Sequence, residues 1–178
     1  PSIVQSGIAG TDELIAFAAQ SESSEARSAL AGALAAQGGP EAERVLDALS
    51  RDSDSNVQNA AVYALANVGS RESVNRLLEI ASSGDSQARS TAISMIANTG
   101  DPRASTVLAD AIRSGDSQLA RRAVYGSHGG GPEVESALFA LVENESADSQ
   151  LRRAAADMLR QRGAEIGTEF LETAASGG

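Results

Sequence analysis

Apolar residues recur along this chain with the spacing of one face of an α-helix. Within residues 55–69, which read SNVQNAAVYALANVG, the apolar positions fall at i, i+4, i+7 and i+8. A period of 3.6 residues produces this spacing, whereas a half-buried strand needs strict alternation. The pattern therefore predicts an all-α protein, and the core stripe of this segment is Val57, Ala61, Ala64 and Leu65.

The same pattern returns in five segments that align without gaps. They begin at Ser24, Ser55, Ser86, Ser117 and Ser149, so the successive steps are 31, 31, 31 and 32 residues. A constant period of this size indicates stacked structural repeats. In the third segment the predicted core stripe is Ala88, Ala92, Met95 and Ile96.

Residue types at the segment ends predict where each helix begins and stops. An aspartate precedes the last four segments, and its side chain accepts hydrogen bonds from the free N–H groups of a first helical turn. Glycine closes most segments, because it adopts the left-handed conformation that ends many helices. The predicted N-caps are Asp54, Asp85, Asp116 and Asp148, and the predicted closing residues are Gly38, Gly69, Gly100 and Gly163.

A second helix is predicted between each pair of segments. Its apolar pairs include Val45–Leu46 and Leu77–Leu78, and Pro40, Pro102 and Pro132 stand at its start, where a missing N–H costs nothing. Each repeat is then a helical hairpin of about 31 residues, too thin to bury its own apolar face. The predicted fold is a right-handed α-solenoid of about five stacked hairpins.

The register of the repeats extends to both ends of the chain. We expect a single α-solenoid domain over residues 1–178 with eleven helices, as one piece of a longer array. Residues 1–7 are expected to end a preceding helix and residues 164–175 to form the last one. The expected repeats are about 8–38, 39–69, 70–100, 101–131 and 132–163.

The string DSDSNVQNAAVYALANVGSRESVNRLLEI, residues 52–80, resembles a HEAT repeat of the short bacterial kind, also called the phycobilin-lyase-type HEAT-like repeat. The resemblance implies an arginine that forms a ladder with aspartates of the turns, and Arg27, Arg89 and Arg152 match it. For Arg89 it implies Asp54 or Asp85 as the partner. The second and fourth repeats depart from the motif at Gln58 and Ala120, so the ladder is expected to be broken there.

Composition narrows the possible functions. The net charge is -10, and a field of this sign argues against nucleic acids and anionic membranes as partners, because both require a basic face. All basic residues are Arg, and there is no Cys, which excludes disulfides and thiolate chemistry. We therefore predict no nucleic-acid and no membrane partner, no metal and no cofactor; cytoplasm and periplasm both remain open.

The stretch YGSHGGGP, residues 125–132, interrupts the repeat. Gly126 and Ser127 stand where the other repeats carry core residues such as Ala64 and Leu65. The pattern predicts a kink or a close-packing point. The single histidine, His128, is predicted to be an exposed residue at a helix end, and we predict no catalytic residue in the chain.

The working surface is predicted on the concave face, which the second helix of each repeat lines. Tyrosine and arginine are favoured at protein interfaces, because they combine contact area with directed hydrogen bonds. We predict a non-catalytic scaffold that binds a protein or peptide, with tyrosines that simply cover the groove as the competing interpretation. The alternative function is a lyase-type enzyme or subunit acting on a tetrapyrrole. The candidate binding residues are Asn59, Tyr63, Ser94, Arg121, Tyr125 and Arg153.

Overall fold

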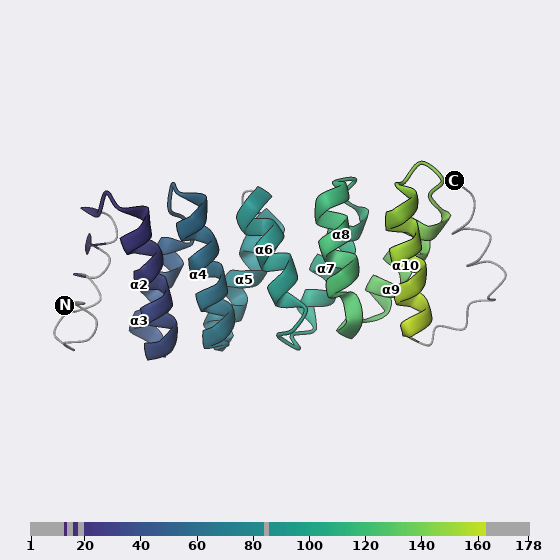
Figure 1. Cartoon of the computed structure of the whole chain (residues 1–178). Helices are drawn as coiled ribbons and strands as arrows, with labels where there is room; N and C mark the ends of the chain where they lie inside the picture. Colours follow the sequence, from purple (N-terminus) through teal and green to yellow (C-terminus); the bar gives the residue numbers. More distant parts are fainter. Residues whose placement is uncertain (1–12, 14–15, 18–19, 84–85, 163–178) are drawn as a thin grey trace. The chain divides into compact units, whose positions relative to one another are not determined.

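The computed structural model describes residues 13, 16, 17, 20–83 and 86–162 (Figure 1). In this part of the chain all regular structure is helical, and the all-α prediction is confirmed. The helices are α2 (Ser24–Gln37), α3 (Gly39–Leu49), α4 (Ser55–Val68), α5 (Arg71–Ser83), α6 (Ser86–Ile96), α7 (Arg103–Arg113), α8 (Ser117–Gly126), α9 (Pro132–Glu143) and α10 (Ser149–Gln161), with a 3₁₀-helix η2 (Ser127–Gly129).

These nine helices match nine of the eleven that the repeat predicts. The last predicted helix and the stub over residues 1–7 lie outside the described residues, as do Asp85 and Gly163, and only parts of the first predicted helix are described. Consecutive helices form stacked hairpins, and the α-solenoid class is confirmed. The right-handed twist and the single-domain boundaries stay predictions.

The chain forms two compact units, residues 1–92 and 93–178. In the first unit α2 and α4 pack side by side, with α3 and α5 against them. In the second unit α7 packs beside α9, and α8 and α10 lie on this pair. Leucines fill both cores: Leu34, Leu46, Leu65, Leu77, Leu108, Leu138 and Leu159 are each at most 1% exposed.

The predicted core stripe is buried with one correction. Val57, Ala61 and Leu65 are at most 1% exposed, but Met95 is only half-buried. Its neighbour Ile93 is fully buried instead, at a position that the stripe did not include. The i+5 position of the second segment, Val62, is buried as well, so the buried face of these helices is wider than the i, i+4, i+7, i+8 set.

Aspartate side chains cap the second helices as predicted. Asp54 accepts a hydrogen bond from the N–H of Asn56 at 2.8 Å, and Asp148 accepts one from the N–H of Leu151 at 2.9 Å. Asp116 caps α8 in the same way. Each cap satisfies N–H groups that the first turn leaves without an intrahelical partner.

One arginine–aspartate pair of the expected ladder is present among the described residues. The Arg27 guanidinium donates from Nε to Asp52 Oδ2 at 2.7 Å and from Nη2 to Asp52 Oδ1 at 2.9 Å. Asp54 is occupied as an N-cap, so the partner lies two residues earlier in the same turn. Arg89 donates a hydrogen bond to the Ala81 carbonyl at 3.1 Å. Its other expected partner, Asp85, lies outside the described residues.

The two departures from the ladder differ. Gln58 still donates to the Asp52 backbone carbonyl at 2.7 Å, so the second repeat keeps one polar link to that turn. Ala120 is 3% exposed and has no polar side-chain atom, so the expected break is confirmed in the fourth repeat.

The interrupting stretch closes α8 without a left-handed glycine. None of the glycines at 126 and 129–131 has a positive φ. A Cβ on Gly126 would lie 3.3 Å from the Ala97 Cβ, and one on Gly130 would lie 2.6 Å from Val134 Cγ2. A side chain at Gly130 would therefore clash with Val134, and one at Gly126 would be tight, so the stretch is a close-packing point.

Hydrogen bonds from two other helices hold the same turn. Arg162, just after α10, donates to the carbonyl of Ser127 at 2.5 Å and to the carbonyl of Gly130. Ser105 Oγ on α7 accepts from the Gly131 N–H at 2.9 Å. Ser127 is fully buried, and its hydroxyl donates to the Val124 carbonyl at 2.6 Å.

Truncation of the core leucine of α4 should be costly. Leu65→Ala removes a side chain that is 1% exposed and leaves a cavity, so the free energy of unfolding should fall by about 2–5 kcal/mol. Urea denaturation measures this loss. Asn67→Ala, at an exposed position of the same helix, should stay within about 0.5 kcal/mol, and an equal loss in both variants would contradict the assignment of the stripe.

The Arg27–Asp52 pair should make stability depend on pH. Hydrogen bonds from Arg27 hold the pKa of the Asp52 carboxyl below its ordinary value of 3.8, although burial opposes this. A carboxyl whose folded pKa is lowered stabilises the fold above the unfolded pKa, and the contribution is lost as the pH falls through the folded pKa. Asp52→Asn should therefore be less stable than the parent at pH 7, and the gap should narrow below about pH 4. Urea denaturation from pH 7 to pH 3 checks this, and a constant gap would contradict it.

The glycines of the close-packing point should not be equivalent. Gly130→Ala forces a methyl group against Val134, so we expect a loss of about 1–3 kcal/mol in unfolding free energy. Gly129→Ala is the matched control, because its Cβ would meet nothing nearer than the Ala97 carbonyl oxygen at 3.9 Å. Thermal denaturation of the two variants decides, and equal losses would show that the space at Gly130 is not the constraint.

Candidate functional site

The second unit carries an open groove of about 850 Å³ along α8, which we call the Tyr125 groove. Its floor and sides include Ala97 and Gly126, which is where the close-packing point brings α8 near the end of α6. The polar lining residues are Ser94, Asn98, Gln118, Arg121, Arg122, Tyr125 and His128.

The spacing on α8 places the main groups on one side of the helix. Gln118, Arg122 and Tyr125 follow each other at i, i+4 and i+7, which puts them one above the other. The Tyr125 side chain is 59% exposed. The following 3₁₀ turn adds His128 at the C-terminal end of the helix.

The groove is locally cationic on an acidic protein. Among the described residues that line it, the only formally charged groups are the guanidinium groups of Arg121 and Arg122. Arg121 Nη2 lies 3.7 Å from Asp148 Oδ1, a long contact with half-exposed partners, which is worth little. Arg122 forms no hydrogen bond or ion pair with a described residue. The arrangement suits a carboxylate or another anionic group beside an aromatic ring.

Three of the six predicted binding residues meet in this groove, namely Ser94, Arg121 and Tyr125. Arg153 is exposed on α10 and does not line it. Tyr63 and Asn59 lie on α4 in the first unit, where Tyr63 is 51% exposed. Asn59 is partly engaged, because its Oδ1 accepts from the Thr91 hydroxyl at 2.7 Å. The single strip through both tyrosines stays a prediction.

Repeat alignment missed part of the lining. Arg122 and Gln118 could have been predicted from their helical spacing to Tyr125. The alignment, however, compared only the positions equivalent to Tyr63 and to Asn59 in each repeat. His128 is exposed, as predicted, yet it also borders the groove. No repeat position corresponds to that placement, because the 3₁₀ turn occurs only after α8 among the described helices.

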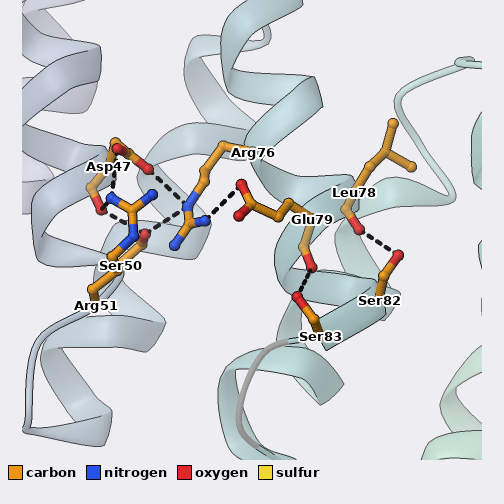
Figure 2. A network of polar contacts seen from close by, with 8 residues as sticks. All are labelled: Asp47, Ser50, Arg51, Arg76, Leu78, Glu79, Ser82 and Ser83. Atoms are coloured by element: carbon orange, nitrogen blue, oxygen red, sulfur yellow. Dashed lines mark hydrogen bonds and ion pairs between the residues drawn. The ribbon is translucent and has the colours of Figure 1, made fainter.

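A groove of about 590 Å³ in the first unit has a different character. Figure 2 shows the polar network on one side of it: Arg76 pairs with Asp47 at 2.8 Å and with Glu79 at 2.7 Å, and Arg51 also pairs with Asp47. The Arg76 side chain is only 13% exposed. Charges in this groove are largely neutralised by one another, so it offers a ligand less than the Tyr125 groove does.

The described residues in and beside the Tyr125 groove do not form a serine–histidine–carboxylate triad. The Ser127 hydroxyl is buried and donates to a backbone carbonyl, and His128 contacts no described carboxylate. In the described part of the chain no three His, Asp or Glu residues gather as a metal site. None of the described helices is long and apolar enough to span a bilayer.

Comparison with known proteins places the fold. Residues 42–129 match the family model described as HEAT repeats. No curated protein matches this sequence. A crystal structure of an engineered protein, a Northeast Structural Genomics Consortium target, is 21% identical, with 94% of each chain covered and a TM-score of 0.44. The family match supports HEAT repeats as such and does not extend to the phycobilin-lyase type.

Proposed function

The chain is a HEAT-repeat protein, and we propose that it is a non-catalytic module that binds an acidic segment of a partner protein in the Tyr125 groove. HEAT repeats commonly serve as protein-interaction scaffolds, and this repeat fold is typically non-catalytic. The observation that carries the proposal is the pair of arginines beside an exposed tyrosine, without a carboxylate among the described lining residues, on a chain of net charge -10.

The chemistry of the groove favours a carboxylate-bearing peptide. Guanidinium groups bind carboxylates through charge-assisted hydrogen bonds, and Arg121 and Arg122 present two of them at one edge. The Tyr125 ring offers apolar area for a neighbouring side chain, and its hydroxyl offers a further hydrogen bond. The amides of Asn98 and Gln118 suit the polar backbone of an extended segment.

The remaining predicted residues belong to the proposal as further contacts. Arg153 is exposed on α10 of the second unit, and Tyr63 with Asn59 offers an aromatic and polar pair on α4 of the first unit. We propose each as a further contact within its own unit, while Tyr125 and its arginines provide the central contact.

Alanine substitutions in the groove should weaken binding strongly. After affinity capture and identification of a direct binder, calorimetry should show that Tyr125→Ala, Arg121→Ala and Arg122→Ala each cost more than about 1 kcal/mol. Binding should also weaken as salt is raised, because the contacts are ionic.

Two controls separate the groove from the rest of the surface. Arg103→Ala removes an exposed arginine on α7 of the same unit, and Glu43→Ala removes an acidic residue on α3 of the first unit. Both should leave the affinity within about twofold of the parent, as near-neutral positions do. Loss of binding in the controls with unchanged affinity in the three groove variants would place the interaction on another surface.

A further inference from the structure

The fourth repeat lacks the arginine that most repeats carry in the first turn of the second helix. The aligned positions are Arg27, Gln58, Arg89, Ala120 and Arg152. What the arginines do elsewhere in the chain shows what is missing at Ala120.

Each arginine donates to a backbone carbonyl that precedes its own helix. Arg89 Nε donates to the Ala81 carbonyl near the end of α5 at 3.1 Å, and Arg152 Nε donates to the Val142 carbonyl near the end of α9 at 3.1 Å. Arg27 Nη1 donates to the Ser21 carbonyl, and its other nitrogens bind Asp52. Arg27 and Arg152 are 9% and 6% exposed. The repeat thus contains a guanidinium site between a helix end and the next turn.

In the fourth repeat, where Ala120 replaces the arginine, the corresponding position is a cavity of about 360 Å³. Its floor is apolar, since Ala120, Ala137 and Leu141 are each less than 10% exposed. Its rim carries the carboxylates of Asp116 and Asp148. A buried apolar floor with an anionic rim fits the aliphatic stem and the charged head of a long basic side chain.

The carboxylates of the rim retain binding capacity. Asp116 and Asp148 use Oδ1 to cap α8 and α10, while Oδ2 of each accepts no hydrogen bond from a described residue. Arg113 also lies on the rim, but its Nη2 donates to the Glu133 carbonyl at 3.4 Å. The long 3.7 Å contact of Arg121 with Asp148 leaves that carboxylate weakly neutralised.

The second repeat also lacks the arginine and has Gln58 in its place, but its surroundings differ from those of Ala120. Gln58 also borders a cavity, of about 290 Å³, but Arg51 and Arg76 line that cavity from neighbouring helix positions. Figure 2 shows Arg76 held there by carboxylates of its own unit. The second repeat therefore supplies two guanidinium groups of its own. The fourth repeat has alanine at the arginine position and Ser146 where Asp52 stands, and the carboxylates at its cavity are those of the N-cap residues Asp116 and Asp148.

We infer that the cavity beside Ala120 is a socket for an arginine side chain of a partner protein. The partner's stem packs on Ala120, Ala137 and Leu141, and its guanidinium binds the Oδ2 atoms that Asp116 and Asp148 do not use for capping. Arginine fits better than lysine, because its planar fork reaches two acceptors at once. This inference concerns a different surface of α8 from the Tyr125 groove and does not rest on the proposed function.

The test uses N-acetyl-arginine methylamide as the probe and the neutral citrulline analogue as its control. In a titration followed by ¹H–¹⁵N NMR, the arginine probe should produce saturable shifts confined to the backbone amides around Ala120 and Asp148. The citrulline analogue should produce no saturable shift there, because it keeps the shape and loses the charge.

Three variants of the full chain make the test specific. Ala120→Arg fills the socket from within and should abolish the shifts. Asp116→Asn retains a good N-cap but removes a charge, so the probe should bind at least threefold more weakly. Asp157→Asn, an exposed carboxylate of α10 outside the cavity, should bind as the parent does.

Each other outcome overturns the inference. Absence of saturable shifts in the parent, equal binding of the citrulline analogue, or retained binding in folded Ala120→Arg would each do so. If Ala120→Arg does not fold, the comparison of Asp116→Asn with Asp157→Asn decides, and equal affinities in that pair reject the socket.

Discussion

A hairpin of two short helices cannot bury its own apolar face, and the other features of this fold depend on that constraint. Each repeat completes its core with residues of the next one, so leucines such as Leu34 and Leu65 recur at the repeat spacing and are fully buried. Polar links follow the same rule, since Arg27 reaches Asp52 in the turn that opens the following helix. A residue at one position is therefore selected together with its neighbours in adjacent repeats.

This constraint explains how much of the fold was predictable. The apolar period, the aspartate caps and the repeat step are local signals, and they gave the described helices within a few residues. Met95 was misjudged because the buried face of these helices is wider than the predicted stripe and takes in Ile93 and, one repeat earlier, Val62. The partner of Arg27 was not predicted, because Asp52 lies in the turn before the next segment and its approach depends on how the two repeats pack.

The candidate groove was only partly predictable for a related reason. Ser94, Arg121 and Tyr125 occupy repeat positions, so alignment of the segments identified them as exposed neighbours. His128 borders the groove because a 3₁₀ turn replaces the last turn of α8, which is a property of the irregular glycines and of their packing. Arg122 was missed because it aligns with neither Tyr63 nor Asn59, although its helical spacing places it beside Tyr125. Repeat symmetry predicts the scaffold and the average surface, whereas the particular shape of the candidate groove comes from the residues that depart from the repeat.

The fourth repeat breaks the symmetry twice, and the two breaks have different consequences for α8. Loss of the core leucine at Ser127 is accompanied by the close approach at Gly126 and by the hydrogen bonds of Arg162 to the turn carbonyls. At Ala120 the arginine is replaced by a small apolar residue, and the space beside it remains open as a cavity. The cationic groove along α8 and the carboxylates of this cavity thus lie on the same helix, so a partner that presents both charges to it would be held in one orientation.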